Sequence, residues 1–148
     1  MAEHPYRIWI AEDNPADVYL IEEALRRHEC AYGLAIAGNG EDMMNMIAQM
    51  EQDPSENCPD LFLIDLNLPR RSGAEILAKI RQCRRCGDVP AIVITSSDSP
   101  QDRAQARELG ASYYFRKPAD LEKFMAIGGV VRKFLESGAD GGRPPVGS

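Results

Sequence analysis

Acidic residues follow two of the apolar, strand-like runs in this sequence, and a hydroxyl and an amine stand at the ends of two later runs. Glu12 and Asp13 follow the first run, and Asp65 follows the apolar sequence LFLI. Thr95 ends a later run, and Lys117 follows the last one. Carboxylates held close together repel one another, and a cation relieves that repulsion. Oxygen ligands without His or Cys at these positions favour Mg²⁺ over zinc.

A metal-bound carboxylate can act as a nucleophile toward phosphorus, and this chemistry suits the predicted group of residues. Asp65 is the candidate nucleophile, since apolar residues nearly surround it in the sequence, and its product would be an aspartyl-phosphate. Catalysis of such a transfer is mostly positioning and charge neutralisation. We expect Mg²⁺, Lys117 and the Thr95 hydroxyl each to take one phosphoryl oxygen. The sequence has no P-loop and no G-x-G-x-x-G after the first run, so nucleotide binding is not indicated.

Five short runs rich in β-branched, aliphatic and aromatic residues alternate with segments of helical spacing. The runs are Tyr6–Ala11, Leu34–Ala37, Leu61–Asp65, Ala91–Thr95 and Tyr113–Arg116. This alternation predicts an α/β fold in which helices cover both faces of a parallel sheet. Right-handed crossovers then favour a doubly wound (βα)5 sandwich. We expect its five strands in the flavodoxin-like order 2-1-3-4-5, one of the two common orders of such sheets. In such sheets the functional site lies beyond the carboxyl ends of the strands.

The helical segments carry recognisable start and stop signals. Asn14 followed by Pro15 predicts the beginning of the first helix, and Gly110 predicts the end of the fourth. Further helices are expected over about 41–50, after residue 73, from residues 99–100, and from about residue 120. Gly128 and Gly129 lie inside the last of these, where each costs about 1 kcal/mol relative to Ala. Close packing on the sheet is one explanation for these two glycines.

Length and charge limit the organisation of the chain. Its 148 residues predict one domain, which we place at residues 5–136, followed by a disordered Gly/Pro-rich tail at residues 137–148. The balance of 17 basic against 23 acidic residues argues against a nucleic-acid-binding surface. No apolar run approaches the length of a membrane span, and Glu12 and Asp13 interrupt any signal-peptide core. We therefore expect a cytoplasmic protein without a membrane partner.

Four cysteines, Cys30, Cys58, Cys83 and Cys86, are scattered along the chain. In a cytoplasmic protein we expect all of them to be reduced thiols. Cys83 and Cys86 form a single C-x-x-C motif near a predicted helix end, whereas reactive motifs of this kind belong at a helix start. A redox or metal function is therefore not expected for this pair.

Several short motifs occur in order along the chain. They are IAEDNPAD at residues 10–17, LIDLNLP at 63–69, ITS at 94–96 and YYFRKP at 113–118. Together with Gly73 and Gly110-Ala111, they resemble the motifs of response-regulator receiver domains of two-component signalling. The resemblance covers about residues 7–135 and implies a CheY-like fold. The NPAD and DLNLP runs are similar to those of stand-alone receivers that partner phytochrome-like or related hybrid histidine kinases.

The resemblance implies a role for each residue of the predicted site. Asp65 would be the phosphoacceptor, and Asp13, Asp65 and the backbone carbonyl of Asn67 would bind Mg²⁺. Glu12 would contact the metal through water, although many members of the family have Asp at this position. Lys117 would neutralise the phosphoryl group, and a cis peptide bond would join it to Pro118.

Two further residues would transmit the modification. By resemblance, the Thr95 hydroxyl moves toward the phosphoryl group, and Tyr114 then turns inward. These changes would bias the surface formed by the fourth helix, fifth strand and fifth helix. A less specific interpretation is that Thr95 is an ordinary β-branched strand residue and Tyr114 an ordinary half-buried aromatic. Glu12 alone also suits a helix cap or a solvated loop charge.

The resemblance also implies the partners of the chain. A histidine kinase or histidine phosphotransfer protein would donate the phosphoryl group, and the chain would assist its own phosphorylation and dephosphorylation without being an enzyme of other substrates. No effector domain follows, so output would run through another protein, by onward relay or by target binding. Homodimerisation through the same surface is also compatible with the resemblance.

Two other functions fit the predicted fold. One is an interaction module that works without phosphorylation, although such modules usually lose the acidic residues that this chain retains. The other is a flavin carrier, because flavodoxin shares the sheet order. The acidic loop at residues 13–16 suits a flavin phosphate poorly without a metal ion.

Overall fold

Five parallel strands form one sheet in the order β2-β1-β3-β4-β5 in the computed structural model, which describes residues 6–29 and 31–139. The strands are β1 (Tyr6–Ala11), β2 (Tyr32–Ala37), β3 (Leu61–Ile64), β4 (Ala91–Thr95) and β5 (Tyr113–Arg116). The predicted α/β class and strand order are therefore confirmed. β2 begins two residues earlier than predicted, because Tyr32 and Gly33 pair in register with Tyr6 and Arg7.

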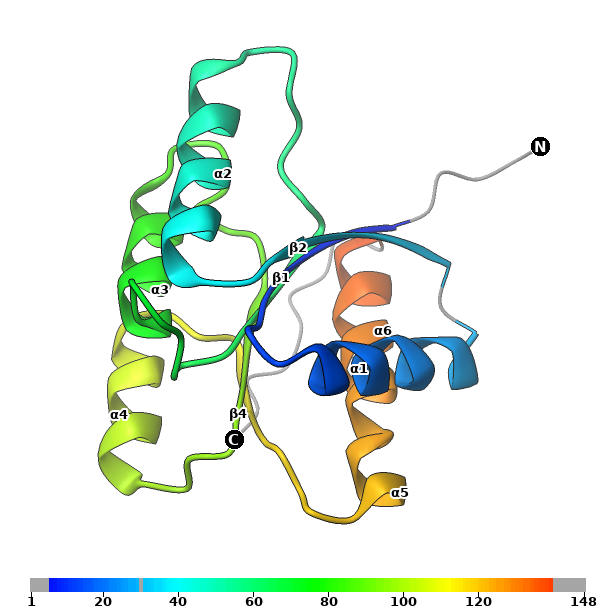
Figure 1. Ribbon diagram of the computed structural model, residues 1–148. Helices are drawn as coiled ribbons and strands as arrows, with labels where there is room; N and C mark the ends of the chain where they lie inside the picture. Colours follow the sequence, from blue (N-terminus) through cyan, green and yellow to red (C-terminus); the bar gives the residue numbers. More distant parts are fainter. Residues whose placement is uncertain (1–5, 30, 140–148) are drawn as a thin grey trace, which may run out of the picture.

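The helices lie on both faces of the sheet. They are α1 (Pro15–Arg27), α2 (Gly40–Gln52), α3 (Gly73–Gln82), α4 (Pro100–Glu108), α5 (Leu121–Phe124) and α6 (Ala126–Ala139). Helices α2, α3 and α4 cover one face, whereas α1, α5 and α6 cover the other (Figure 1). Each face of the sheet thus has its own buried layer, as a doubly wound sandwich requires.

Alternation along the strands divides the core between the two faces. In β1, Ile8 and Ile10 belong to the cluster beneath α1 and α6, whereas Trp9 and Ala11 belong to the cluster beneath α2 and α3. All residues of β3 and β4 are buried, because helices cover both sides of these central strands. The central strands therefore form a rigid support for the groups at their ends.

Local signals place the helix ends as the sequence predicts. The Asn14 side chain accepts a hydrogen bond of 2.9 Å from the Ala16 N–H, and Pro15 occupies the first turn of α1. Gly110 follows the C-cap of α4 with φ +94°, a left-handed conformation that favours glycine. Both predicted signals are confirmed.

The last predicted helix is divided into two. Asp120 caps α5, as its side chain accepts from the N–H groups of Glu122 and Lys123. At Met125 the chain makes a tighter turn, in which the Gly128 N–H donates to the Met125 carbonyl at 3.1 Å. Helix α6 then continues to Ala139, so the segment predicted as a tail begins in helix, and residues 140–148 lie outside the described residues.

Gly128 has a packing reason, and it differs from the one suggested by the sequence. A Cβ atom at this position would lie 2.2 Å from the Ala24 backbone oxygen, on α1 rather than on the sheet. At Gly129 the corresponding nearest atom, 3.2 Å away, belongs to the imidazole of His28. The close approach of α6 to the backbone of α1 therefore requires glycine at position 128.

The expectation that all cysteines are reduced is wrong for one pair. Cys58 and Cys86 form a disulfide, Cys83 is free and buried, and Cys30 lies outside the described residues. The loop before β3 and the segment after α3 bring the two Cα atoms to 5.7 Å, within the range that a disulfide spans. An argument from cellular compartment could not detect this proximity, because it depends on the fold.

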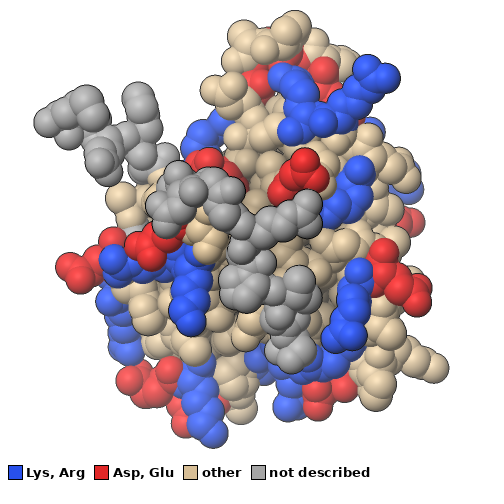
Figure 2. All heavy atoms as spheres, turned by 180° about the vertical axis from the view of Figure 1, so that it is seen from behind, with Lys and Arg blue, Asp and Glu red and all other residues tan. Residues whose placement is uncertain are grey.

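Charged side chains of both signs are intermixed on the face seen in Figure 2, where Lys and Arg stand beside Asp and Glu. Among the described helices, none has the length and apolar character needed to cross a membrane.

Candidate functional site

The carboxyl edge of the sheet gathers the three predicted acidic residues. Glu12 and Asp13 directly follow β1, and Asp65 directly follows β3. One carboxylate oxygen from each lies within 4.8 Å of the others. Backbone pairing fixes two of them, since the Glu12 N–H donates to the Ala37 carbonyl and the Asp65 N–H to the Ala11 carbonyl, both at 3.0 Å. The clustering therefore follows from strand register.

Burial makes this cluster electrostatically unusual. Glu12 is 2% exposed and Asp65 is 5% exposed, whereas Asp13 is exposed to solvent. Burial raises the pKa of Glu12 from 4.5 to about 7; the Lys117 hydrogen bond opposes this and the Asp65 charge adds to it. Because Glu12 holds its proton near neutral pH, a cation bound beside this carboxyl group would favour loss of that proton.

Lys117 brings the opposite charge to the same place. Its backbone N–H donates to the Thr95 carbonyl at 2.7 Å, directly after β5. Its Nζ then donates to Asp17 at 2.7 Å, to Glu12 at 2.8 Å and to Asp65 at 2.9 Å. Burial lowers the pKa of the Lys117 amine, but these three hydrogen bonds raise it by more, so the ammonium stays charged.

Asp17 is the site residue that the sequence analysis missed. It lies in the first turn of α1, four residues after Asp13. The available signal was the helix start at Asn14 and Pro15, which places Asp17 in the first turn, close in the chain to the acidic residues after β1. Asp17 binds the Lys117 ammonium and so anchors α1 to the site.

The peptide bond before Pro118 is trans, as are all peptide bonds of the described residues, so the prediction of a cis bond is wrong. A trans bond before proline is favoured by about 0.5–1 kcal/mol. With this bond, Lys117 reaches the carboxylates of Glu12, Asp17 and Asp65.

The donor set fits a hard divalent cation. Four carboxylates, those of Glu12, Asp13, Asp17 and Asp65, face a single ammonium, so negative charge is in excess. All ligand atoms on offer are oxygens, which suits hard ions better than zinc. The chain thus presents an acidic site for a divalent metal ion at the edge of the sheet.

The loop after β3 is held closely around Asp65. The Asn67 N–H donates to Asp65 Oδ1 at 3.0 Å, and the Gly73 N–H donates to the Leu66 carbonyl at 3.1 Å. A Cβ atom on Gly73 would lie only 2.4 Å from the Asp65 carbonyl oxygen. Gly73 is therefore required for the close approach of α3 to this loop.

Thr95 and Asn67 connect the loop to β4. Thr95 is fully buried, and its hydroxyl accepts hydrogen bonds of 3.4 Å from the Asn67 side-chain amide and from the Ser97 N–H. The hydroxyl therefore lies beside the Asp65 loop, where the sequence analysis expects it.

Tyr114 points inward and is only 6% exposed. Its hydroxyl donates to the Ser97 carbonyl at 3.0 Å, and the Arg103 guanidinium lies 4.5 Å from the centre of its ring. Ser97 also forms a hydrogen bond with Asp102 of α4. Thr95 and Tyr114 thus both contact Ser97, one through its N–H and the other through its carbonyl.

An acidic, lysine-containing edge on a five-stranded doubly wound sheet defines the class of CheY-like signalling domains that accept a phosphoryl group on an aspartate. The chain belongs to the response regulator receiver domain family, whose family model matches residues 8–127. It is a receiver of a two-component system.

Curated relatives extend this assignment. The response regulator Rcp1 of Synechocystis is 31% identical over 134 residues, covering 90% of this chain and 91% of Rcp1. The response regulator MprA of a Mycobacterium species is 33% identical over 125 residues, covering 82% of this chain. The match covers 48% of MprA, so the chain spans about half the length of that relative.

Solved structures agree in fold. The phosphorylated cyanobacterial phytochrome response regulator RcpA superposes with a TM-score of 0.79 at 30% identity, over 91% of this chain and 96% of RcpA. The Mn²⁺-bound form of Rcp1 gives the same TM-score at 30% identity, over 90% and 96% of the two chains. A divalent metal ion is therefore bound by a protein to which this chain is similar.

Proposed function

We propose that Asp65 is the phosphoacceptor of this receiver and that Mg²⁺ is the metal ion that supports the transfer. The observation that carries the proposal is the convergence of Lys117 Nζ on Asp65 Oδ2 at 2.9 Å, beside the carboxylates of Glu12 and Asp13. Asp65 is the buried acid that both a cation site and an ammonium flank, as a nucleophile toward a phosphoryl group requires.

Asp13, Asp65 and the backbone carbonyl of Asn67 would hold Mg²⁺, with Glu12 contacting it through water. When bound, the metal ion supplies positive charge to a phosphoryl oxygen and lowers the repulsion between that group and the carboxylates. Lys117 neutralises a second oxygen, and the Thr95 hydroxyl donates to a third. The same groups would assist hydrolysis of the acyl phosphate, so the chain takes part in both its phosphorylation and its dephosphorylation.

The proposed donor is a phosphohistidine on a kinase or a histidine phosphotransfer protein. A cavity of about 320 Å³ beside Glu12 and Asp13 also contacts Tyr19 of α1 and Ile36 of β2. Tyr19 is 62% exposed and Ile36 is 47% exposed, which is unusual for large apolar side chains next to a charged site. We assign this surface to the donor protein, and the description of RcpA as a phytochrome response regulator supports a phytochrome-like kinase as that donor.

The proposed output surface consists of α4, β5 and the helix that follows. Tyr114 is inward in this structure. Phosphorylation would stabilise this rotamer by drawing Thr95 toward the phosphoryl oxygens. The stabilised surface binds a protein target or pairs with a second copy of the chain, or Asp65 passes its phosphoryl group onward to another protein. We place this output in a cytoplasmic pathway without nucleic acid or membrane.

Phosphate-affinity gels after incubation with Mg²⁺ and acetyl phosphate test the assignment. We expect a shifted band that Asp65→Asn abolishes, whereas Asp88→Asn, which changes an exposed acid in the loop before β4, leaves it unchanged. A shift that persists in Asp65→Asn would refute Asp65 as the acceptor. If no shifted band appears on the gel, yet the protein binds its partner equally with and without Mg²⁺, the chain would be a phosphorylation-independent module. A yellow purified protein would indicate a flavin carrier.

A second experiment tests the donor surface separately. Tyr19→Glu and Ile36→Glu should slow phosphorylation by the cognate histidine kinase while leaving the acetyl phosphate reaction within about twofold, because only the protein donor contacts these side chains. Equal slowing with both donors would place the effect on Asp65 itself and remove the docking assignment.

A further inference from the structure

We propose that Cys58 and Cys86 are a reversible thiol–disulfide site, oxidised by a low-molecular-weight disulfide or a hydroperoxide. The two residues are 28 positions apart, and their Sγ atoms are bonded. Cys58 lies in the loop between α2 and β3, and Cys86 lies after α3, so both are at the amino end of the sheet. The site is therefore independent of the proposed phosphorylation of Asp65, which lies at the opposite end.

The two sulfurs differ in accessibility, and this difference defines how the site reacts. Cys58 is partly exposed, whereas Cys86 is fully buried and its Sγ lies 3.5 Å from the Sδ of Met50. A small thiol or oxidant therefore reaches the Cys58 sulfur first. The third described cysteine, Cys83, is 2% exposed, so it is not open to such reagents.

The oxidation balances as a two-step exchange. The Cys58 thiolate attacks a small disulfide, forms a mixed disulfide and releases one thiolate. The Cys86 thiolate then attacks the Cys58 sulfur, forms the intramolecular bond and releases the second thiolate. The two protons lost by the cysteines convert these leaving groups to thiols. With a hydroperoxide, the Cys58 thiolate attacks the terminal peroxide oxygen, the O–O bond breaks, and a sulfenic acid forms as the alcohol (or water, from hydrogen peroxide) leaves with a proton. The Cys86 thiol then attacks the Cys58 sulfur, forms the S–S bond and releases water.

Contacts other than the disulfide hold the same segments together. The Arg85 guanidinium donates to the Glu56 carbonyl at 2.7 Å and also to the Met50 carbonyl. Arg7 donates to the Asn57 carbonyl at 2.9 Å and forms an ion pair of 3.6 Å with Glu56. When the S–S bond opens, these contacts keep Cys58 near Cys86, so reduction does not unfold the protein and the bond can form again.

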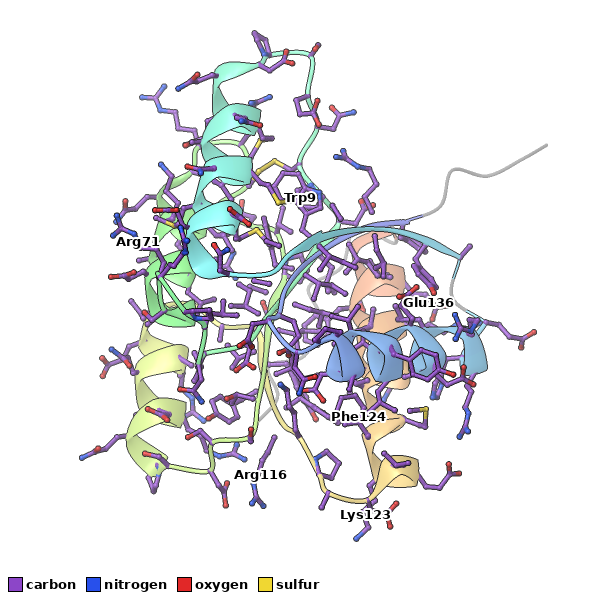
Figure 3. All side chains as sticks on the ribbon, viewed as in Figure 1. Trp9, Arg71, Arg116, Lys123, Phe124 and Glu136 are labelled. Atoms are coloured by element: carbon purple, nitrogen blue, oxygen red, sulfur yellow. A yellow bond between two sulfur atoms is a disulfide. The ribbon has the colours of Figure 1, made fainter. Side chains whose placement is uncertain are left out.

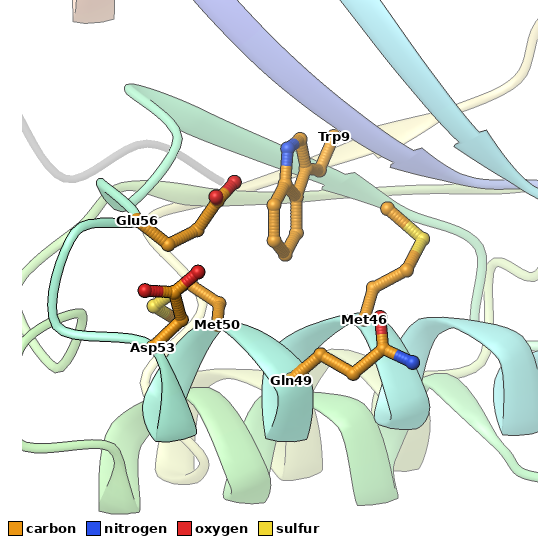
Figure 4. A pocket seen from close by; sticks show the side chains of 6 residues that line it. All are labelled: Trp9, Met46, Gln49, Met50, Asp53 and Glu56. Carbon is orange, nitrogen blue, oxygen red and sulfur yellow. The ribbon is translucent and has the colours of Figure 1, made fainter.

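A cavity of about 290 Å³, lined in part by the Trp9 ring, lies one residue away from the disulfide, because Met50 lines the cavity and also contacts Cys86. Figure 4 shows its lining, with Asp53 and Glu56 to one side of the ring and Met46 and Gln49 to the other. Figure 3 labels Trp9 and draws the S–S bond in yellow. Because Glu56 is two residues before Cys58, opening the bond removes one of the contacts that position this wall of the cavity, while the Arg7 and Arg85 contacts remain.

The sole tryptophan of the chain therefore reports on the redox state of this site. The test uses the full chain carrying Cys30→Ser, equilibrated in buffers of varied reduced-to-oxidised glutathione ratio. Alkylation and peptide mapping give the fraction of Cys58–Cys86 bond. We expect one reversible two-electron transition, a parallel change in Trp9 emission, and a melting temperature lower by roughly 10 °C in the reduced form.

Two matched variants separate the site from its surroundings. Cys58→Ser should abolish the transition, and Cys83→Ala, which changes a buried cysteine of the same region, should retain it. The proposal is refuted if all cysteines are alkylated in the most oxidising buffer, if Cys86 pairs with Cys83 instead, or if the bond persists in the most reducing buffer. Equal Trp9 emission in both forms would refute the link to the cavity wall. Acetyl phosphate reactivity, measured in parallel, distinguishes any of these outcomes from a failure of Asp65 as phosphoacceptor.

Discussion

The two ends of the sheet are held together by opposite kinds of interaction. At the carboxyl end, Glu12, Asp17 and Asp65 surround the Lys117 ammonium, and excess negative charge is left over. At the amino end, a covalent bond between Cys58 and Cys86 joins segments that also pack on apolar side chains.

Because the two sites lie at opposite ends of the sheet, one small domain can carry a carboxylate–ammonium site and a disulfide that react independently. β3 has four residues, so its first and last residues are separated by roughly 10 Å at about 3.3 Å per residue. All four residues are buried between helices, and a rigid strand keeps the two ends apart. The carboxyl end should therefore respond to pH and metal ions, and the amino end to thiols.

Removal of the Lys117 ammonium should change stability more than any other substitution proposed here, because it leaves the carboxyl end without its positive charge. Lys117→Met leaves buried Glu12 and Asp65 without their counter-ion, which should lower the free energy of unfolding by roughly 3 kcal/mol at pH 8. Denaturant unfolding measures this, and added Mg²⁺ should restore part of the loss. Lys123→Met, at an exposed position of α5, is the control and should be neutral. A stable Lys117→Met protein would mean that the carboxylates need no cation.

A smaller effect compares one glycine at each end. In Gly73→Ala the new Cβ would lie 2.4 Å from the Asp65 backbone oxygen, so α3 or the loop must move. We expect a loss of about 1–3 kcal/mol in stability, together with slower phosphorylation by acetyl phosphate. Gly87→Ala, with its nearest backbone oxygen at 3.0 Å, lies at the amino end and should leave phosphorylation unchanged. Equal phosphorylation rates in the two variants would contradict the close packing argued for Gly73.

Metal binding at the carboxyl end should also depend on pH. The pKa of Glu12 in the folded protein is about 7, above its ordinary value of 4.5, so between these values the native state holds a proton that the unfolded chain has lost. Stability without metal should therefore fall as the pH rises through this window. Mg²⁺ needs the ionised site, so its affinity should fall roughly tenfold from pH 8 to pH 6.

Isothermal titration calorimetry at the two pH values measures this change in Mg²⁺ affinity. Glu12→Gln removes the titrating group and should flatten the dependence. A slope that Glu12→Gln leaves unaltered would assign the titration to another residue.

We expect little coupling between the contributions of the metal site and of the disulfide to the free energy of unfolding. Mg²⁺ and the Cys58–Cys86 bond each stabilise the fold, and sites this far apart usually contribute additively within about 0.5 kcal/mol. Unfolding with and without Mg²⁺, in oxidised and reduced protein, forms a complete cycle. A coupling well above that value would show that the ends communicate through β3 and α3.

Much of this molecule follows from local sequence. The strand order and the convergence of Glu12, Asp13, Asp65, Thr95 and Lys117 could be predicted, because parallel strands end at one edge and each of these residues lies at a strand end. Asn14, Pro15 and Gly110 set helix limits through their own backbone chemistry. These features depend on a residue and its near neighbours, together with strand direction.

Other features depend on distances between segments remote in sequence, and the tertiary structure alone decided them. Cys86 pairs with Cys58 rather than with Cys83, because the loop before β3 approaches the end of α3. The break after α5 and the trans bond before Pro118 were likewise not predicted. Gly128 is required by the backbone of α1, and Lys117 binds Asp17 as well as the predicted acids. Sequence patterns encode which face a residue presents, whereas the exact partner across that face is fixed only when helices and loops pack.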